Sequence, residues 1–174
     1  MKKAVFSSLC CLVFLACLGQ EVEAQNKVGQ LLKNTAKDVV LDPTTYAPTA
    51  LSLFGKKLDW DSSQIFFKNG YVESHPAFTI SRLPFDTAIS HAAGNKKIIE
   101  ISLPVLRLSV LNNVTVSMSE RLLVDRHPNH KKLIKSIGWI EKIAMASYFS
   151  YQYSNKNFSQ WQLNKRMARE LGLK

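Results

Sequence analysis

The side chains best suited to acid-base chemistry in this chain are its histidines, and two of them share one segment. His75 and His91 lie within residues 71–95, which contain two prolines and show no helical period, and Asp86 lies between them. A histidine oriented by a carboxylate can activate a hydroxyl nucleophile. His91, Asp86 and His75 are therefore the candidate catalytic residues of a small cofactor-free hydrolase. The sequence lacks the Gly-x-Ser-x-Gly elbow that presents such a nucleophile, so catalysis is not the favoured interpretation.

The other two histidines, His127 and His130, are the candidate metal ligands. They are three residues apart, and Asp125 precedes them. Two imidazoles and a carboxylate suit zinc, copper or nickel. Pro128 lies between the histidines, however, and breaks the helical spacing that brings ligands onto one face. With no third ligand identifiable, the sequence predicts a solvent-facing turn here, and neither a metal nor another cofactor.

The C-terminal third of the chain is strongly basic and rich in aromatic residues. From Arg126 to Lys174 there are ten lysines and arginines but only two acidic residues, in a chain of net charge +10. Cations beside aromatic rings suit anionic lipid surfaces, glycans and acidic proteins. The residues predicted to bind such a partner are Lys135, Lys142, Lys165, Arg166, Arg169 and Trp161. Rings at helical spacing are also typical of a core, and a basic face can be merely solvated.

The N-terminal residues resemble a secretory signal peptide. Lys2 and Lys3 precede an apolar stretch, and Val22-Glu23-Ala24 has the small-residue cleavage pattern. The predicted domains are a signal peptide at 1–24 and a single exported domain at 25–174, periplasmic or secreted. Export makes nucleic acid an improbable partner. A lipobox-like Leu15-Ala16-Cys17 leaves the alternative of a membrane-tethered lipoprotein acylated at Cys17.

The three cysteines of the chain are Cys10, Cys11 and Cys17. A mature domain that begins after them has no disulfide, thiol nucleophile or thiolate metal site. We therefore expect it to be held together by burial alone, for which about 150 residues are sufficient.

Helical periodicity predicts an all-α fold, a small helical bundle built on a long antiparallel hairpin. Its two helices are expected at about 96–126 and 129–153, with their apolar stripes facing the core. Short helices are predicted at 26–40 and 47–58, and another is predicted to begin after Asp59 or Asp61, both of which suit an N-cap. A C-terminal helix spans about 158–171, and residues 71–95 are irregular. Asn69-Gly70 fits either a β-hairpin or a helix end, and we favour the helix end.

These features favour a non-enzymatic envelope protein that binds an anionic partner through its basic, aromatic C-terminal half. A small hydrolase with its site on residues 71–95 is the alternative. The oligomeric state does not follow from the sequence.

Overall fold

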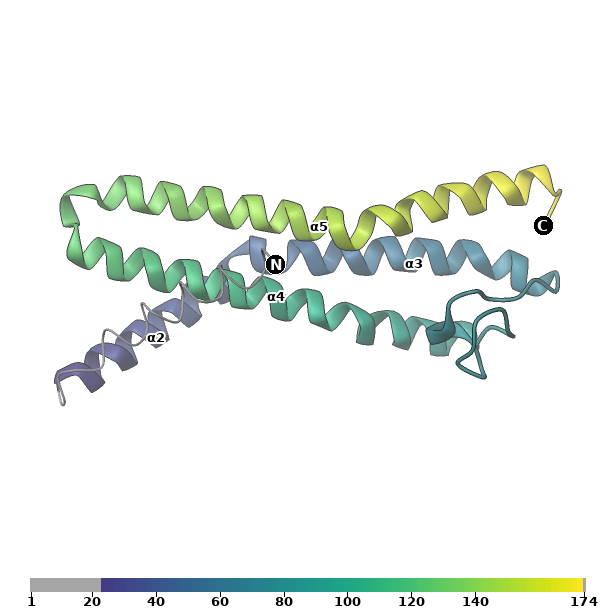
Figure 1. Ribbon diagram of the computed structural model, residues 1–174, viewed down its shortest axis with the longest axis horizontal. Coiled ribbons are helices and arrows are strands. Elements are labelled where there is room, and N and C mark those ends of the chain that lie inside the picture. Colours follow the sequence, from purple (N-terminus) through teal and green to yellow (C-terminus); the bar gives the residue numbers. More distant parts are fainter. Residues whose placement is uncertain (1–22, 174) are drawn as a thin grey trace, which may run out of the picture. The chain divides into compact units, whose positions relative to one another are not determined.

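The computed structural model describes residues 23–173, in which α-helix is the dominant secondary structure (Figure 1). The α-helices are α2 (Glu23–Leu41), α3 (Ala47–Lys68), α4 (His91–Arg126) and α5 (Lys131–Glu170). Short 3-10 turns occur at η1 (Pro43–Thr45), η2 (Pro76–Phe78) and η3 (Pro128–His130). The prediction of an all-α helical bundle is confirmed. Most of the predicted signal peptide and the candidate lipidation site Cys17 lie outside the described residues.

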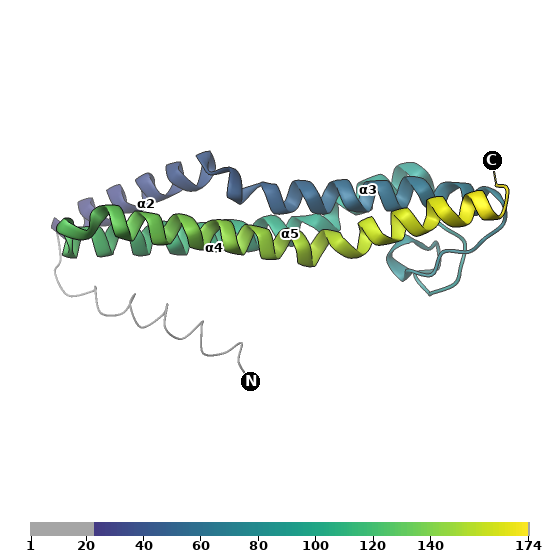
Figure 2. The same cartoon turned by 90° about the horizontal axis from the view of Figure 1, so that it is seen from above.

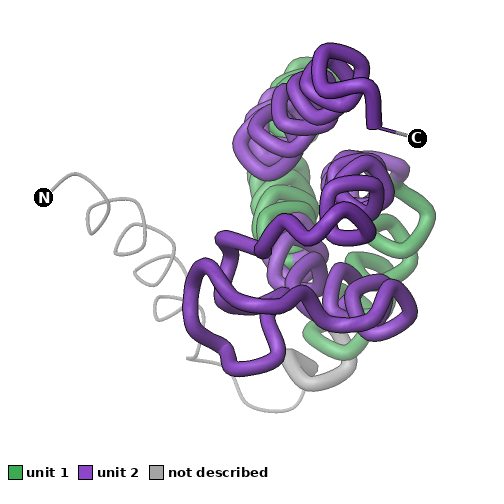
Figure 3. The backbone as a smooth tube through the Cα atoms, turned by 90° about the vertical axis from the view of Figure 1, so that its right-hand side faces the viewer, with its two compact units in different colours: residues 1–42, 111–142 green, residues 43–110, 143–174 purple. Residues whose placement is uncertain are grey.

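The described residues form two compact units that share helices α4 and α5 (Figure 3). Unit 1 contains residues 23–42 and 111–142, and unit 2 contains residues 43–110 and 143–173. Each unit therefore combines a separate N-terminal piece with one portion of α4 and one portion of α5. The prediction of a single domain at 25–174 remains a prediction.

Unit 1 is held together by ion pairs as well as by packing. The guanidinium of Arg121 on α4 donates to the Asp38 carboxylate on α2. Lys142 on α5 is only 7% exposed, and its ammonium lies 3.4 Å from Asp42 Oδ2 and 3.9 Å from Glu120 Oε1. At Gly138, a Cβ atom would overlap the Glu120 side chain, so glycine lets α5 approach α4 closely.

In unit 2, α3 runs alongside the first part of α4 and the last part of α5, as Figures 1 and 2 show. Gly55 of α3 faces the Phe158 ring and the Ser154 carbonyl oxygen of α5, and a Cβ atom there would be in ordinary van der Waals contact with both. Trp60 of α3 is 4% exposed and covers Gly94 of α4. These contacts place the buried side of α3 between the two longer helices.

The residues predicted to divide α3 into two helices lie inside one continuous helix. Gly55 costs about 1 kcal/mol in a helix interior, but its contacts with Phe158 and Ser154 lie within the packed α3–α5 surface, and the helix continues through it. Asp59 and Asp61 do not act as N-caps: Asp59 accepts a hydrogen bond from Asn164, and Asp61 pairs with Lys57 one turn earlier. The break expected between residues 58 and 61 is thus wrong.

The end of α3 at Lys68 confirms the choice of a helix end over a β-hairpin. Gly70 adopts a left-handed φ of 82°. The N–H of Tyr71 donates to the Phe66 carbonyl and that of Gly70 to the Phe67 carbonyl, a pattern of the Schellman motif.

The last two helices begin or end beyond the predicted limits. α4 starts at His91 rather than about 96, because Ser90 Oγ accepts the N–H of Ala93 and caps the helix earlier. α5 continues through residues 153–158 to Glu170, so the predicted separate C-terminal helix is wrong. Ser154 and Asn157 donate their side-chain hydrogen bonds to carbonyls one turn back, which keeps these polar residues compatible with a helix.

The segment between α3 and α4 is irregular, as predicted, but hydrogen-bonded. Glu73 and Asp86 exchange backbone hydrogen bonds of 2.8 and 3.1 Å, and an isolated bridge joins Thr79 to Ala88. Arg82 and Phe85 between these bridges have positive φ values of 62° and 59°. The backbone thus forms a closed loop whose tip contains residues 80–85.

The apolar stripes of α4 and α5 do not face the core as predicted. Ile99 and Leu103 on α4 are exposed, and so are the α5 stripe residues Leu133, Ile137 and Ile140. The buried face of α4 combines Ile98, Val105 and Val116 with the small or polar residues Ser102, Ser109, Asn113 and Ser117. Small residues let helix backbones approach closely, which explains why this face is the one that packs. α4 is also long and apolar enough to span a membrane, a criterion that core helices of soluble proteins meet as well.

Candidate functional site

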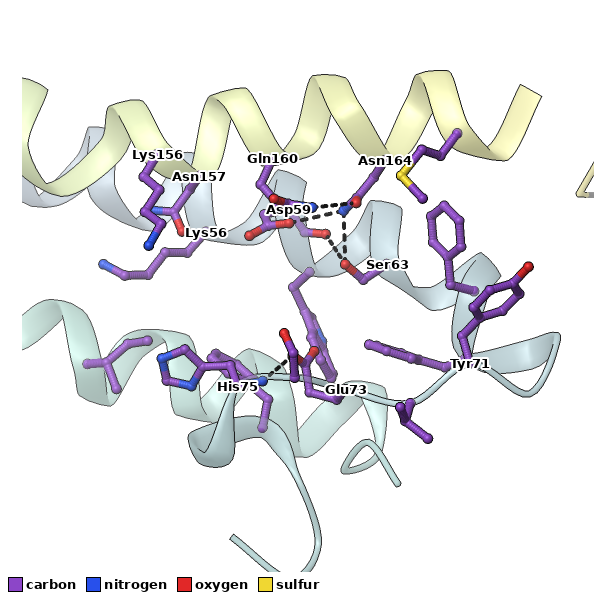
Figure 4. A pocket seen from close by; sticks show the side chains of 18 residues that line it. Lys56, Asp59, Ser63, Tyr71, Glu73, His75, Lys156, Asn157, Gln160 and Asn164 are labelled. Carbon is purple, nitrogen blue, oxygen red and sulfur yellow. Dashed lines mark hydrogen bonds between the residues drawn. The ribbon is translucent and has the colours of Figure 1, made fainter. Parts of the chain in front are cut away.

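Unit 2 contains a cavity of about 530 Å³, which is within the range of small-molecule sites (Figure 4). Its lining comes from α3, from the start of the 69–90 loop, from α5 and, through Ile101, from α4. The polar lining residues are Lys56, Asp59, Ser63, Glu73, Ser74, His75, Lys156, Asn157, Gln160 and Asn164. The apolar lining is largely aromatic, with Trp60, Phe66, Phe67, Tyr71 and Phe78.

Asp59 is the central carboxylate of this cavity. Asn164 Nδ2 of α5 lies 3.1 Å from Asp59 Oδ1 and within 3.1 Å of the hydroxyls of Ser62 and Ser63. Gln160 in turn donates to Asn164 Oδ1 at 2.9 Å. Burial and, second, the nearby Glu73 charge raise the pKa of Asp59 to about 6, against the opposing effect of the Asn164 hydrogen bond. Asp59 therefore exchanges a proton close to neutral pH.

Two lysines, Lys56 of α3 and Lys156 of α5, extend toward one end of the cavity (Figure 4). Lys56 Nζ contacts the hydroxyls of Ser52 and Ser102, the latter at 3.3 Å. Burial lowers the pKa of Lys56. In the described part of the chain, neither ammonium group forms an ion pair with a carboxylate. This end of the cavity is cationic and lacks a counter-charge.

Glu73 and His75 of the loop line the wall of the cavity that lies across from the α5 side chains (Figure 4). The backbone N–H of His75 donates to Glu73 Oε1 at 2.7 Å, and His75 Nδ1 accepts the N–H of Ala77 at 3.2 Å. The imidazole also packs edge-on against Phe78. His75 is thus the one predicted catalytic candidate that lines the cavity.

His91 and Asp86, the other catalytic candidates, have separate partners. His91 Nε2 lies 2.8 Å from Asp61 Oδ1, and the His91 carbonyl accepts from Trp60 Nε1. Burial would raise the pKa of Asp61, but hydrogen bonds from Lys57 and His91 outweigh it and lower that pKa. Asp86 accepts the backbone N–H of Ser81, and hydrogen bonding, first from Ser81, lowers the pKa of Asp86. The three candidates therefore do not converge on one catalytic group.

The metal candidates His127 and His130 lie at the α4–α5 turn. His127 precedes η3 and His130 ends it, and both are exposed. Within residues 23–173 no group of three histidines, aspartates, glutamates or cysteines is arranged to hold a metal ion.

The residues predicted to bind an anionic partner divide into three groups. Lys142 is buried and paired with Asp42, so its expected place on an exposed face is wrong. Lys135 is exposed and belongs to unit 1.

Lys165, Arg166 and Arg169 are exposed near the end of α5 in unit 2. The Lys165 ammonium lies 4.9 Å from the centre of the half-buried Trp161 ring. We call these three cations and Trp161 the α5 basic face.

The polar part of the cavity is defined by three residues that are not predicted from the sequence, Lys56, Asp59 and Asn164. Asp59 and Asn164 are 105 positions apart, and only the packing of α3 against α5 brings them together. The sequence does contain one indication, because polar residues recur at helical spacing. Asp59, Ser62 and Ser63 share one helix face, and Gln160 and Asn164 share a face of another helix.

The chain matches no known protein-family model, no curated protein and no solved structure.

Proposed function

We propose that this protein is an exported, non-enzymatic binding protein that attaches to an anionic envelope surface through the α5 basic face. One observation carries the proposal: Lys165, Arg166 and Arg169 are exposed and, among the described residues, form no ion pair with a carboxylate. At about 100° per residue, the three side chains fall within about 100° of the helix circumference. They can therefore contact one anionic surface together.

The loop tip supports attachment to lipid in particular. Ile80, Leu83 and Phe85 are 64–74% exposed, and Arg82 lies among them. Figures 1 and 2 both show this loop at the same end of unit 2 as the C-terminal end of α5. Apolar side chains that enter the lipid interface beside cations that attract anionic headgroups form a recognised mode of peripheral membrane binding.

The test is co-sedimentation of the protein with vesicles. Wild type is expected to bind phosphatidylglycerol vesicles more tightly than phosphatidylcholine vesicles, with binding that weakens as salt rises above about 0.1 M. Lys165→Glu/Arg166→Glu/Arg169→Glu should lose this binding. Lys68→Glu/Lys96→Glu/Arg107→Glu changes the net charge equally at exposed sites elsewhere in unit 2 and is the control. If both variants lose vesicle binding equally, the α5 basic face is not the binding surface. If wild type binds an acidic glycan but not vesicles, the anionic surface is a glycan and not a lipid.

Export is supported by the charged and apolar pattern of residues 1–24. The intact mass of the protein from a fractionated host tests it. A soluble species that begins at Gln25 supports a periplasmic or secreted protein, whereas a membrane-bound species that begins at acylated Cys17 supports a lipoprotein. An uncut chain in the cytoplasm would contradict both forms.

A second function, a small cofactor-free hydrolase, is favoured by one observation, the raised pKa of Asp59 beside Glu73 in the cavity. Carboxyl groups with shifted pKa values in a pocket suit general acid-base catalysis. If the protein turns over a chromogenic ester or glycoside, the pH–rate profile should show an inflection near the pKa of Asp59. Asp59→Asn should abolish the turnover. Turnover that Asp59→Asn leaves unchanged would contradict this role.

A further inference from the structure

The unit 2 cavity has one charged end and one aromatic end. Lys56 and Lys156 extend to one end, whereas Tyr71 lies at the other (Figure 4). Phe66 and Phe67 add aromatic surface to the same cavity, and Phe66 packs edge-on against Tyr71 at a centroid distance of 5.6 Å. The shape suits a molecule with an ionised group at one end and an apolar body at the other.

The carboxylates of the cavity are held by hydrogen bonds within the chain, whereas its two lysines form no ion pair among the described residues. The carboxylate of Asp59 already accepts from Asn164, and that of Glu73 accepts from the His75 N–H. The amide of Asn157 donates to the Tyr153 carbonyl. The ammonium groups of Lys56 and Lys156 have no anionic partner among the described residues.

The surroundings of Lys56 also lack an anionic group. Its ammonium contacts only the neutral hydroxyls of Ser52 and Ser102, both of which are fully buried. A partly buried cation without a counter-charge is unfavourable, and burial accordingly lowers the pKa of Lys56. A second cation, Lys156, extends to the same end (Figure 4).

We infer that this cavity binds a small amphipathic organic anion, a carboxylate, sulfonate or phosphate monoester with an aromatic or aliphatic body. The anionic group lies between Lys56 and Lys156, and the apolar body packs along Phe66, Phe67 and Tyr71. The anion neutralises the lysine pair, and charge-assisted hydrogen bonds of this kind are the strong ones in protein sites. The site is separate from the α5 basic face, so it does not depend on the proposed attachment to membranes.

Two matched dyes test the inference with the full chain. The first is 8-anilinonaphthalene-1-sulfonate, an anion with an aromatic body, and the second is N-phenyl-1-naphthylamine, nearly the same body without the sulfonate. We expect saturable fluorescence with both. Lys156→Gln and Lys56→Gln should each raise the Kd of the sulfonate dye about tenfold, which corresponds to one lost charge-assisted contact. The Kd of the uncharged dye should not change.

The controls separate the cavity from general electrostatics and from misfolding. Lys57→Gln removes the neighbouring cation on α3, which pairs with Asp61 and does not line the cavity, and should leave both dyes unaffected. Lys156 is exposed and has no ion pair in the described chain, so Lys156→Gln should keep the wild-type melting temperature even if Lys56→Gln does not. An unchanged Kd for the sulfonate dye in Lys156→Gln, or an equal rise in Lys57→Gln, would overturn the inference.

Discussion

At the scale of single residues, Asp59 and Asp61 form a natural pair, because their environments shift the two pKa values in opposite directions. Burial raises the pKa of Asp59 from its ordinary 3.8 to about 6, whereas the hydrogen bonds from Lys57 and His91 lower that of Asp61 despite some burial. Between about pH 4 and pH 6 the folded chain holds a proton on Asp59 that the unfolded chain releases. Stability contributed by Asp59 therefore falls as pH rises through this window.

Asp59→Asn is expected to raise the free energy of unfolding at alkaline pH and to leave it almost unchanged near pH 4. After allowance for partial solvent screening, the free energy of unfolding at about pH 8 should rise by about 1 kcal/mol. Asp61→Asn, two residues along the same helix, should instead destabilise the fold at neutral pH, with the difference lost as pH falls below 3.8. Urea unfolding at several pH values measures both. A gap between Asp59→Asn and wild type that does not grow with pH would contradict the assigned environment.

At Gly94, the packing cost of an alanine side chain should outweigh the gain in helix propensity. Alanine normally favours a helix over glycine by about 0.5–1 kcal/mol. At position 94, however, a Cβ atom would overlap the buried Trp60 indole, which packs on Phe78 and donates to the His91 carbonyl. Gly94→Ala should lower the free energy of unfolding by about 1–3 kcal/mol. Gly29→Ala on α2, where no atom lies within 4 Å, is the control and should be stabilising.

At the scale of elements, α5 presents its apolar stripe to solvent rather than to the chain. Leu133, Ile137 and Ile140 are each 58–60% exposed, whereas Ile98 on α4 is 2% exposed. Ile140→Ala should therefore change the free energy of unfolding by about 0.5 kcal/mol or less, as surface substitutions do. Ile98→Ala should cost about 2–5 kcal/mol. Thermal melts compare the two, and a large loss in Ile140→Ala would mean that the stripe is covered in solution.

The helices themselves were predictable from the sequence, but their orientation was not. Periodicity located α2, α4 and the first part of α5, because it reports that a helix has two unlike faces. It does not report which face packs inward. On α4 the inward face is small and polar, with Ser102, Asn113 and Ser117, because close helix packing there needs small side chains more than apolar ones.

The cavity was beyond sequence reasoning for a different reason. The predictions concentrated on the irregular segment, which does contribute His75 and Glu73. The remaining polar groups come from helix interiors, where Asp59 was interpreted as a helix cap and Asn164 carried no signal. Only tertiary packing across more than a hundred positions joins them.

At the scale of the whole molecule, a high net charge acts against association through the exposed apolar side chains. The chain carries a net charge of +10, which repels a second copy. The exposed stripe on α5 and exposed apolar residues such as Trp139, at 62%, favour burial against another surface. Added salt screens the repulsion and leaves the apolar attraction in place, so ionic strength decides which effect dominates.

Self-association of the purified protein is therefore expected to increase with salt. Sedimentation velocity should show a mainly monomeric species at about 0.01 M salt, where charge repulsion extends about 30 Å, and larger species at about 1 M, where it extends about 3 Å. Leu133→Gln/Ile140→Gln should reduce the salt-induced species, since it removes apolar area from the stripe without changing the charge. Leu106→Gln/Leu122→Gln, at half-buried positions on α4, is the comparison and should mainly lower stability. Association that weakens with salt would show instead that opposite charges on two copies hold them together.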